Sequence, residues 1–376
     1  MSKPVAGAME WPLPVDVVKP SSACEWFSPL GVSDWDTRLE NFAGANVFHT
    51  AAWSRVIQQA YGFEPVFLRE SVGEGQETIL PLAEVRSWLR GSRGVCLPFA
   101  DFCAPLSRDY GKEASVLSTD LWEAVVDRGR ERGWKYVEIR GEPGSILPDE
   151  APVPSLHVLE HRIDLTLPPE QLQANLHPGM RRNIRKAESS GLQVEISTQR
   201  EAVREYYELH CLTRRNKHGL PPQPLRLFEA IATELIERKA GFVVLVRDAK
   251  SQEPLAGAVF LRWKDQAIYK YGASDDRHLA RRPNNLVLWK GILQCKALGC
   301  SQLSLGRTDL GHEGLRRFKT GLGAAEQQVK FYRYDLKAER WGTERSLHEG
   351  WHNGLFRRLP LWANRLAGEI LYPHLD

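Results

Sequence analysis

The most regular stretch of this chain begins with Phe242-Val-Val-Leu-Val-Arg247 and ends with Gln302-Leu-Ser-Leu305. Short apolar runs separated by Gly, Pro and charged residues predict strands, and a longer run that ends at a glycine predicts a helix. Three antiparallel strands, followed by a helix that crosses back to a fourth strand, predict a mixed α/β unit. The predicted elements between the two ends are strands 255–263 and 266–272, a helix over 284–298 and its terminator Gly299.

The first half of the chain repeats this order of elements. Thr50 is a plausible N-cap for a helix that ends at Gly62. Lys135-Tyr-Val-Glu-Ile-Arg140 then follows a helix and Gly133, as 302–305 follows a helix and Gly299. The similarity predicts two copies of one unit. The other elements predicted here are strands at 65–70, 78–86 and 95–99 and a helix over 118–132.

The length of 376 residues also favours two domains. The predicted division is an irregular arm over 1–40, a first domain over 41–155, a second and catalytic domain over 156–336, and a C-terminal tail over 337–376. A Pro-rich joint separates the two domains. The second domain is expected to begin with a strand at 162–167, a basic helix over 178–190, a strand at 193–197, and helices over 199–216 and 224–239.

Composition places the chain among water-soluble globular proteins, with 42% hydrophobic and 26% charged residues. No apolar run approaches the roughly 20 residues of a bilayer span, and the first residues lack a signal-peptide core, so a cytoplasmic protein is expected. The six cysteines include no C-x-x-C pair and are expected to be buried thiols. No metal is expected, because the histidines show no ligand spacing, and neither a G-x-S-x-G elbow nor a Walker loop occurs.

The net charge of +3 conceals an asymmetry between the two halves. Residues 1–150 contain 15 Lys/Arg against 22 Asp/Glu, whereas residues 151–376 contain 35 against 25. The range 277–319 holds nine cations and only two acids. Such enrichment favours a surface for phosphates, nucleic acid or anionic lipid, and a solvated basic face is the alternative.

One segment combines these cations with glycines, and it reads Arg307-Thr-Asp-Leu-Gly-His-Glu-Gly-Leu-Arg-Arg-Phe-Lys-Thr-Gly-Leu-Gly323. It leaves a strand, turns, and enters a short helix. It resembles the C-terminal signature of the FemAB-like acyltransferases, a branch of the GNAT superfamily. Four other stretches resemble that family in the same order, and they are Phe48–Trp53, Leu97–Asp101, His177–Ala187 and Tyr269–Asp275 with Pro283-Asn284 and Trp289.

The resemblance covers about residues 45–335 and is closest to FemAB-like proteins encoded with exopolysaccharide and protein-sorting systems. It implies two tandem GNAT-like domains with mixed, largely antiparallel sheets. It also implies transfer of an amino acid from aminoacyl-tRNA to an amine of a peptidoglycan-type precursor. In the family a Phe-Lys pair lies at the reaction centre, which corresponds here to Phe318 and Lys319. Tyr269 and Tyr271 would lie on a strand beside that pair.

The expected catalytic chemistry is stabilisation of charge. Aminolysis of an ester or thioester passes through an oxyanion, which an ammonium such as that of Lys319 stabilises, and a tyrosine can pass a proton to the leaving group. The alternatives are a solvent-facing lysine and tyrosines that only pack. Asp101 either touches the acceptor or is a turn residue. The substrate-binding residues implied by the resemblance are Arg307, Asp275, Asn284, Asn285, Trp289, Arg316 and Asp101.

Clustered cations suggest how the donor is held. Arg181, Arg182, Arg185 and Lys186 cluster on one predicted helix, and their spacing places the last three on adjoining faces. Such a cluster suits a polyphosphate or RNA backbone, although a membrane-facing or solvated helix is an alternative. Arg281 and Arg282 precede another helix, at a place where ordinary GNAT enzymes have a Gly-rich coenzyme A loop. No R/Q-x-x-G-x-G/A segment occurs here, so the donor is expected to be aminoacyl-tRNA rather than acyl-CoA, with no tightly bound cofactor.

The tail from Trp351 to Leu371 is basic and amphipathic. It suits either the inner face of an anionic membrane or docking against the second domain. The sequence therefore predicts an aminoacyltransferase acting on a cell-envelope or saccharide acceptor. The two alternatives are an acyl-CoA-dependent N-acyltransferase and a non-catalytic module that binds RNA or a polymer.

Overall fold

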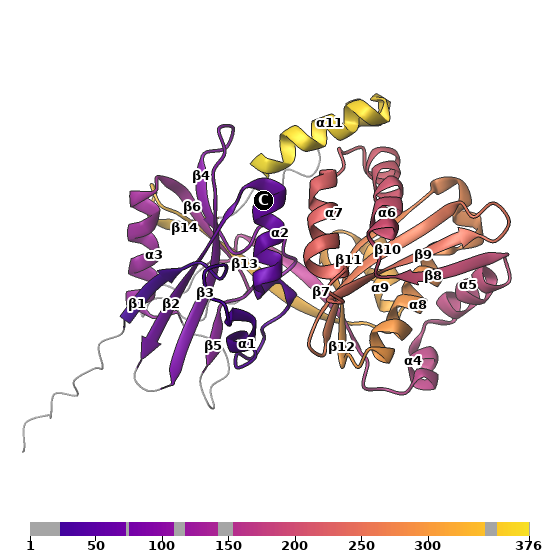
Figure 1. Cartoon of the computed structure of the whole chain (residues 1–376), viewed down its shortest axis with the longest axis horizontal. Coiled ribbons are helices and arrows are strands. Elements are labelled where there is room, and N and C mark those ends of the chain that lie inside the picture. The colour runs from indigo at the N-terminus through magenta and orange to yellow at the C-terminus, as the bar shows by residue number, and fades with distance from the viewer. Residues whose placement is uncertain (1–22, 73–74, 109–116, 142–152, 343–351, 376) are drawn as a thin grey trace, which may run out of the picture.

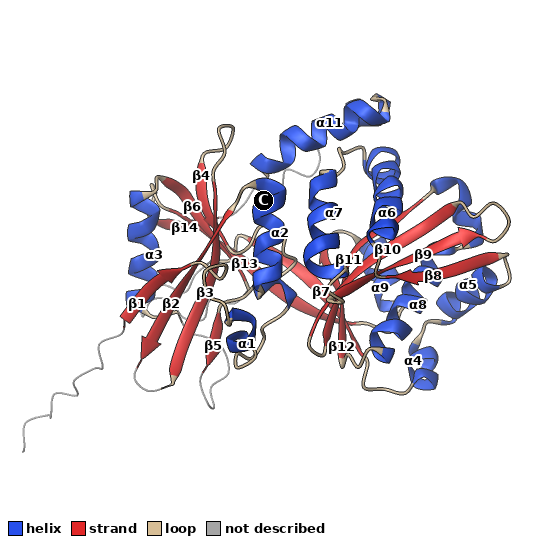
Figure 2. Ribbon diagram, viewed as in Figure 1, coloured by secondary structure: helices blue, strands red, loops and turns tan. Residues whose placement is uncertain are grey.

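The computed structural model describes residues 23–72, 75–108, 117–141, 153–342 and 352–375. One large sheet runs through the molecule, with helices on both faces (Figures 1 and 2). Its strands follow the order β1-β2-β3-β4-β6-β13-β7-β12-β11-β10-β9-β8, while β5 pairs with β3 and β14 with β13. The predicted fold class, a tandem α/β arrangement with a mixed sheet, is confirmed.

The two halves use the same construction. The first half contains β2 (Glu64–Val72), β3 (Gln76–Val85), β4 (Ser92–Val95), α3 (Thr119–Glu131) and β6 (Trp134–Arg140). The second half contains β9 (Gly241–Asp248), β10 (Pro254–Trp263), β11 (Gln266–Ser274), α8 (Pro283–Ala297) and β12 (Gln302–Asp309). In both, three antiparallel strands are followed by a helix and a strand parallel to the third, so β4 pairs with β6 and β11 with β12.

A pair of strands crosses between the halves. β7 (Leu156–Asp164) follows the first half in sequence but pairs with β12 of the second. β13 (Ala325–Asp335) follows the second half but pairs with β6 of the first. β7 and β13 also pair with each other over seven residues. The sheet is therefore continuous across the two halves. The predicted boundary between the first and second domains at residue 155 remains a prediction.

Helices on one face share a core between the halves. Buried side chains of α2 (Ala51–Tyr61), α6 (Arg200–Thr213) and α7 (Leu225–Ile231) belong to one hydrophobic cluster that also includes Phe67 and Ile268. On the opposite face, α4 (Pro169–Asn175), α5 (Pro178–Glu188) and α8 cover the second half, and α3 covers the first. The N-cap of α2 is as predicted: the Thr50 hydroxyl accepts a hydrogen bond from Trp53 N, and Gly62 follows with φ 72°.

Several elements differ from the sequence-based prediction. The arm contains β1 (Ala23–Phe27) and α1 (Trp35–Leu39). The strand predicted over 95–99 is wrong, because β4 ends at Val95 and the next residues turn through left-handed conformations at Leu97 and Phe99. The two helices after β8 (Leu192–Ser197) end in the π-turns η2 (Arg214–His218) and η3 (Ala232–Ile236), and β13 was not predicted. Cys24 is exposed, whereas the other five cysteines are buried.

The remaining elements are short. They are η1 (Val47–His49), β5 (Leu106–Arg108), η4 (Asp276–Arg281), α9 (Glu313–Thr320), β14 (Arg340–Gly342), α10 (His352–Arg358), α11 (Leu361–Leu371) and η5 (Tyr372–His374). The tail docks against the second half, since Arg365 of α11 pairs with Glu208 of α6, and Glu369 accepts from Leu225 N of α7. No helix in the described ranges is both long and apolar enough to traverse a bilayer.

Close packing of α8 on the sheet depends on Gly291. A Cβ at this position would lie 2.1 Å from the ring of Phe260, which is fully buried and stacked on Phe242. We expect Gly291→Ala to lower the free energy of unfolding by about 1–3 kcal/mol, the usual cost of overpacking. Chemical denaturation monitored by circular dichroism measures the effect.

A second helical glycine provides the control. Gly314 of α9 has no atom within 4 Å of the added Cβ, so Gly314→Ala should be neutral or stabilising by up to about 1 kcal/mol. Equal destabilisation by the two substitutions would contradict the packing described for α8.

Candidate active site

The candidate site lies where β11 and β12 separate. These parallel neighbours pair only through Gln266–Ile268, opposite 302–304. Beyond these positions both strands continue, to Ser274 and Asp309, without pairing with each other. The register of β12 against β7 also shifts between Ser304 and Arg307. This strand divergence leaves room within the sheet for side chains from elsewhere.

A loop of the first half reaches the strand divergence. The Lys270 ammonium on β11 donates to the Asp101 carboxylate at 2.7 Å and to the Phe99 carbonyl at 2.6 Å. Asp101 also lies beside β12, since its Oδ1 is 3.2 Å from the position that a Cβ would take on Gly306. Asp101 therefore lies between the two separated strands and is more than a turn residue.

The loop that carries Asp101 has a strained backbone held by cations. Leu97 and Phe99 adopt φ values of 32° and 62°, in the left-handed region that side chains disfavour. The buried Arg140 guanidinium donates to the carbonyls of Leu97 and Ala100, and Lys270 binds the carbonyl between them. These contacts from two other strands fix the position of the carboxylate.

Charge and burial have opposite effects on the pKa values of Asp101 and Lys270. Burial by itself would raise the pKa of Asp101, but the ammonium of Lys270, together with Arg307 and Lys319, lowers it. Burial lowers the pKa of Lys270, while Asp101 opposes that change. Asp101 is therefore an ionised carboxylate at neutral pH.

Lys319 points inward from α9. Its side chain is buried, with only 4% of its surface exposed, and its ammonium donates to the carbonyls of Gly306 and Arg307 at 3.0 Å each. Burial lowers the pKa of Lys319 to about 8, against the attraction of Asp101, Glu160 and Asp309. An ammonium has three N–H donors, so one remains for a further acceptor.

The residues predicted to act with Lys319 are divided between the two faces of the sheet. Phe318 and Tyr269 pack against the cluster beneath α5 and α8. Tyr271 packs on the opposite cluster, against Phe228 of α7. The cause is a bulge, because β10 pairs Phe260 with Tyr269 but Val259 with Tyr271, which leaves Lys270 as an extra residue. The structure does not bring the two tyrosines together.

Most of the predicted substrate-binding residues have internal partners. Asp275 caps η4 and pairs with Arg277. Asn284 donates to Ser274 Oγ, Asn285 donates to Met180 Sδ, and Arg316 forms a two-bonded pair with Glu326. Trp289 is buried on α8. Arg307 is exposed, and its guanidinium lies 5.7 Å from the ring of Phe331.

The predicted phosphate-binding residues also separate into two groups. Arg181, with Arg185, lines a cavity of about 220 Å³ between α5 and Trp289 of α8, and Arg182 and Lys186 are exposed on the same helix. Arg281 instead donates to the carbonyls of Ser190 and Gly191 and pairs with Asp248, so its cation is engaged in holding the fold. Arg282 is exposed before α8 in a left-handed conformation.

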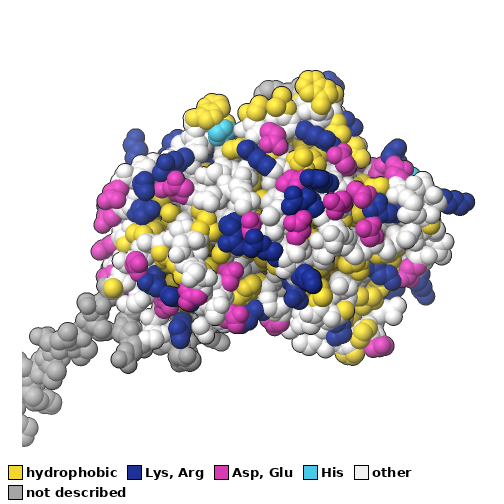
Figure 3. Space-filling model, in the orientation of Figure 1, with side chains coloured by type: hydrophobic (Ala, Val, Ile, Leu, Met, Phe, Trp, Pro, Cys, Tyr) yellow, Lys and Arg dark blue, Asp and Glu magenta, His cyan; other side chains and the backbone are white. Residues whose placement is uncertain are grey.

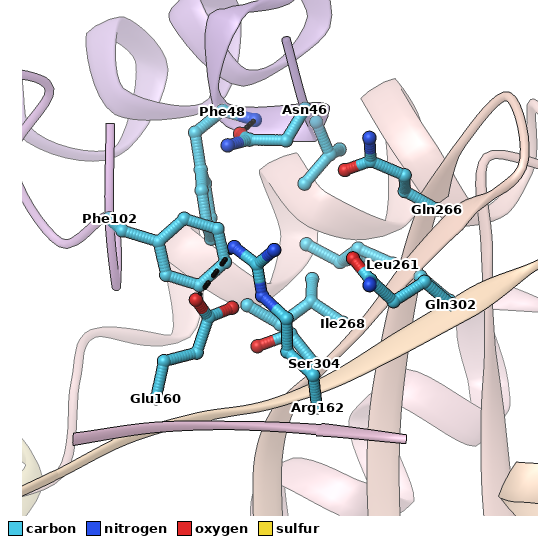
Figure 4. A pocket seen from close by; sticks show the side chains of 12 residues that line it. Asn46, Phe48, Phe102, Glu160, Arg162, Leu261, Gln266, Ile268, Gln302 and Ser304 are labelled. Carbon is cyan, nitrogen blue, oxygen red and sulfur yellow. Dashed lines mark hydrogen bonds and ion pairs between the residues drawn. The ribbon is translucent and has the colours of Figure 1, made fainter. Parts of the chain in front are cut away.

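A small pocket between the halves contains side chains that the sequence analysis missed (Figure 4). Glu160 of β7 is 1% exposed, and neither of its oxygens accepts a hydrogen bond from a described residue, although Arg162 forms an ion pair with it at 2.7 Å. The cavity holds about 20 Å³, enough for one water-sized group. Its other polar and aromatic walls are Asn46, Phe48, Phe102, Gln266, Gln302 and Ser304.

Two electrostatic interactions connect this pocket to the strand divergence. The Lys270 ammonium lies 5.0 Å from the ring centre of Phe48, and Glu160 is close enough to Lys319 to raise its pKa. Glu160 was missed because the strand was predicted at 162–167, whereas β7 begins at Leu156 and includes it. Only its apolar neighbours Val158 and Leu159 gave a sign of burial.

One group of side chains within the described residues has the spacing of metal ligands, namely Glu253, Asp275 and His278. Both of its carboxylates pair with the Arg277 guanidinium. Their charge is thereby already balanced by a cation.

Comparisons with known proteins agree with this fold. Residues 175–320 match the model of a family described as acetyltransferase (GNAT) domain. None of the curated proteins matches the sequence. The crystal structure of FemX is similar with a TM-score of 0.59 and 14% identity, covering 81% of this chain and 96% of FemX. A tandem GNAT protein from the clavulanic acid biosynthesis pathway, without AcCoA, has a TM-score of 0.50 and 9% identity, covering 86% of this chain and all of that one.

The family match includes α5, α8, Lys319 and both strands of the strand divergence, β11 and β12, but not the loop that carries Asp101. The likeness to FemX and to the tandem protein extends the shared fold to both halves. Residues 175–320 therefore match the model of a GNAT acetyltransferase domain, in a chain that shares its fold with FemX and with a tandem GNAT protein.

Proposed function

We propose that the chain is an acyltransferase that moves an aminoacyl group from aminoacyl-tRNA to an amine or hydroxyl of a cell-envelope or saccharide acceptor. The observation that carries the proposal is the buried ammonium of Lys319 at the strand divergence, 3.0 Å from two carbonyls and attracted by Asp101 of the other half. A structural lysine on a short surface helix would ordinarily extend into water.

The proposed reaction needs no covalent intermediate on the enzyme. The acceptor amine attacks the ester carbonyl, a tetrahedral oxyanion forms, and the ribose hydroxyl leaves with a proton that the amine gives up. Lys319 stabilises the oxyanion with its remaining N–H, and low polarity strengthens that contact. Asp101 and Glu160 support the protonated state of Lys319, because both raise its pKa.

The acceptor is proposed to enter through the pocket between the halves. Glu160 supplies a buried carboxylate, which is paired with Arg162 at 2.7 Å, next to a space the size of one ammonium group. Phe48 and Phe102 supply apolar walls, while Gln266 and Gln302 supply neutral polar groups (Figure 4). This combination suits an amine on an uncharged polar chain, such as a saccharide or a peptide stem.

The donor admits two candidates, each with its own support. Exposed cations on α5, which in the described structure form no ion pairs, suit an RNA backbone. The match to an acetyltransferase family over 175–320 instead favours acyl-CoA. The association with exopolysaccharide systems stays a prediction.

Replacing Lys319 tests the catalytic assignment. Lys319→Met keeps the length of the side chain but removes the ammonium, and we expect kcat to fall by a factor on the order of 10²–10³, as for the loss of one oxyanion donor. Transfer from a panel of charged tRNAs and acyl-CoAs to amino-sugar and peptide acceptors, followed by mass spectrometry, measures the rate.

Lys296 supplies a matched control. It is also partly buried on a helix and donates to a backbone carbonyl, that of Leu165, but lies outside the site. Lys296→Met should leave kcat unchanged, and unchanged thermal unfolding should accompany both variants. Full transfer activity in folded Lys319→Met protein would refute the proposed role.

The pH dependence follows from the pKa of about 8 for Lys319. The ammonium is the active form, so kcat should be highest below pH 8 and fall as the pH rises through it. Glu160 raises this pKa, so Glu160→Gln should move the descending limb to lower pH, whereas exchange of the exposed Asp164 for Asn should not. With a hydroxyl acceptor, which does not titrate in this range, a rate that climbs through pH 8 would show that neutral Lys319 acts as a base, against the proposal.

The two donors can be separated at α5. If RNA binds there, Arg181→Glu combined with Arg185→Glu should raise the KM for aminoacyl-tRNA about tenfold or more and flatten its salt dependence. Arg204→Glu, an exposed site on α6, should have no such effect. Unaltered use of tRNA by the α5 variant, together with micromolar binding of coenzyme A, would favour acyl-CoA as the donor.

A further inference from the structure

Large apolar side chains are exposed together along one edge of the molecule (Figure 3). Trp88 is 81% and Trp362 is 70% exposed. Leu89, Leu366 and Ile370 each expose more than half of their surface. Single exposed apolar residues are common, but two tryptophans with three aliphatic residues form a patch of the kind that marks an interaction site.

The patch joins two distant parts of the sequence. Trp88 and Leu89 lie in the loop between β3 and β4, whereas the others lie on α11. The Trp88 ring lies 5.0 Å from the ring of His374, directly after α11. Ser87 contacts His374 Nδ1, and the buried Arg93 donates to its carbonyl. These contacts hold the loop and the end of the tail beside each other.

α11 exposes these apolar side chains because its opposite face is packed against the protein. Trp362, Leu366 and Ile370 are spaced by four residues, so they form one stripe about 12 Å long. On the opposite side Asn364 and Gly368 are buried, and a Cβ on Gly368 would lie 2.1 Å from the carbonyl of Pro222. The tail is therefore docked on the protein and still has an unpartnered apolar stripe.

The charged residues that directly precede α11 in the chain are positive. Arg357 and Arg358 are exposed at the end of α10, and Arg357 contacts the carbonyl of Lys217, itself exposed. The acids near α11, Glu208 and Glu369, are already paired with Arg365 and Arg226. The cations thus have no neutralising partner among the contacts described for α10 and α11.

We propose that this edge docks on the surface of an anionic lipid bilayer, with Trp88 and Trp362 inserted at the level of the headgroups and Arg357 and Arg358 facing lipid phosphates. Tryptophan favours this interface because its ring is apolar and its N–H is polar. Cations beside an apolar stripe complement a negative membrane surface, whereas a second copy of this chain would bring like charges together. The inference does not depend on the acyl-transfer proposal.

Flotation of the full chain with vesicles tests the proposal. We expect the chain to bind vesicles of phosphatidylcholine with 30% phosphatidylglycerol and to bind phosphatidylcholine alone only weakly. Added salt should release it from the anionic vesicles, because salt screens the attraction between the cations and the lipid phosphates. Trp88→Ser combined with Trp362→Ser should lower the bound fraction about tenfold or more. Arg357→Gln with Arg358→Gln should lower binding to the anionic vesicles only.

The controls separate docking from unfolding and self-association. Leu310 is 45% exposed but lies outside the patch, so Leu310→Ser should bind as the unchanged protein does. All variants should keep their thermal midpoint, because the exchanged side chains are on the surface. Equal vesicle binding by the double tryptophan variant would overturn the proposal. A second result would also overturn it: the unchanged protein does not bind vesicles but forms a concentration-dependent dimer in sedimentation velocity, and the double tryptophan variant does not form that dimer.

Discussion

The buried ion pair between Asp101 and Lys270 is the contact on which the site depends. It joins a loop of the first half to the third strand of the second half, and it places a carboxylate between β11 and β12. A pair removed from water to this extent is favourable only when further hydrogen bonds satisfy it, and the Phe99 carbonyl supplies one. Removing either partner would leave the other charge buried and unbalanced, so the halves constrain each other through it.

Local signals were strong enough to predict most of the fold. Thr50 and Gly62 delimit α2 because one caps the first turn and the other accepts a left-handed conformation. The correspondence of Gly133 and Gly299, each between a helix and a strand, revealed the repeat. β13 escaped prediction because its first residues, such as Glu326 and Gln327, are polar and exposed, and its place in the sheet is set by β6 and β7, which are far away in sequence.

The site could be predicted only in part, and for a similar reason. A resemblance drew attention to Lys319, but nothing local indicates that the strand divergence buries its ammonium. Tyr269 and Tyr271 appeared to share a face, since alternate residues of a regular strand do, and only the bulge at Lys270 separates them. Glu160 becomes notable only when Phe102 of the other half closes over the same pocket. These features arise from contacts between distant segments, which sequence periodicity does not record.

The exchange of β7 and β13 has a consequence for how the chain is made. β6 ends at Arg140, yet the strand that covers its free edge is Ala325–Asp335, nearly two hundred residues later. While the ribosome synthesises the intervening chain, the nascent first half therefore carries an uncovered sheet edge, which is a site for mispairing. Completion of the amino-terminal half must wait for almost the whole polypeptide to emerge, so folding during translation cannot proceed simply from one end to the other.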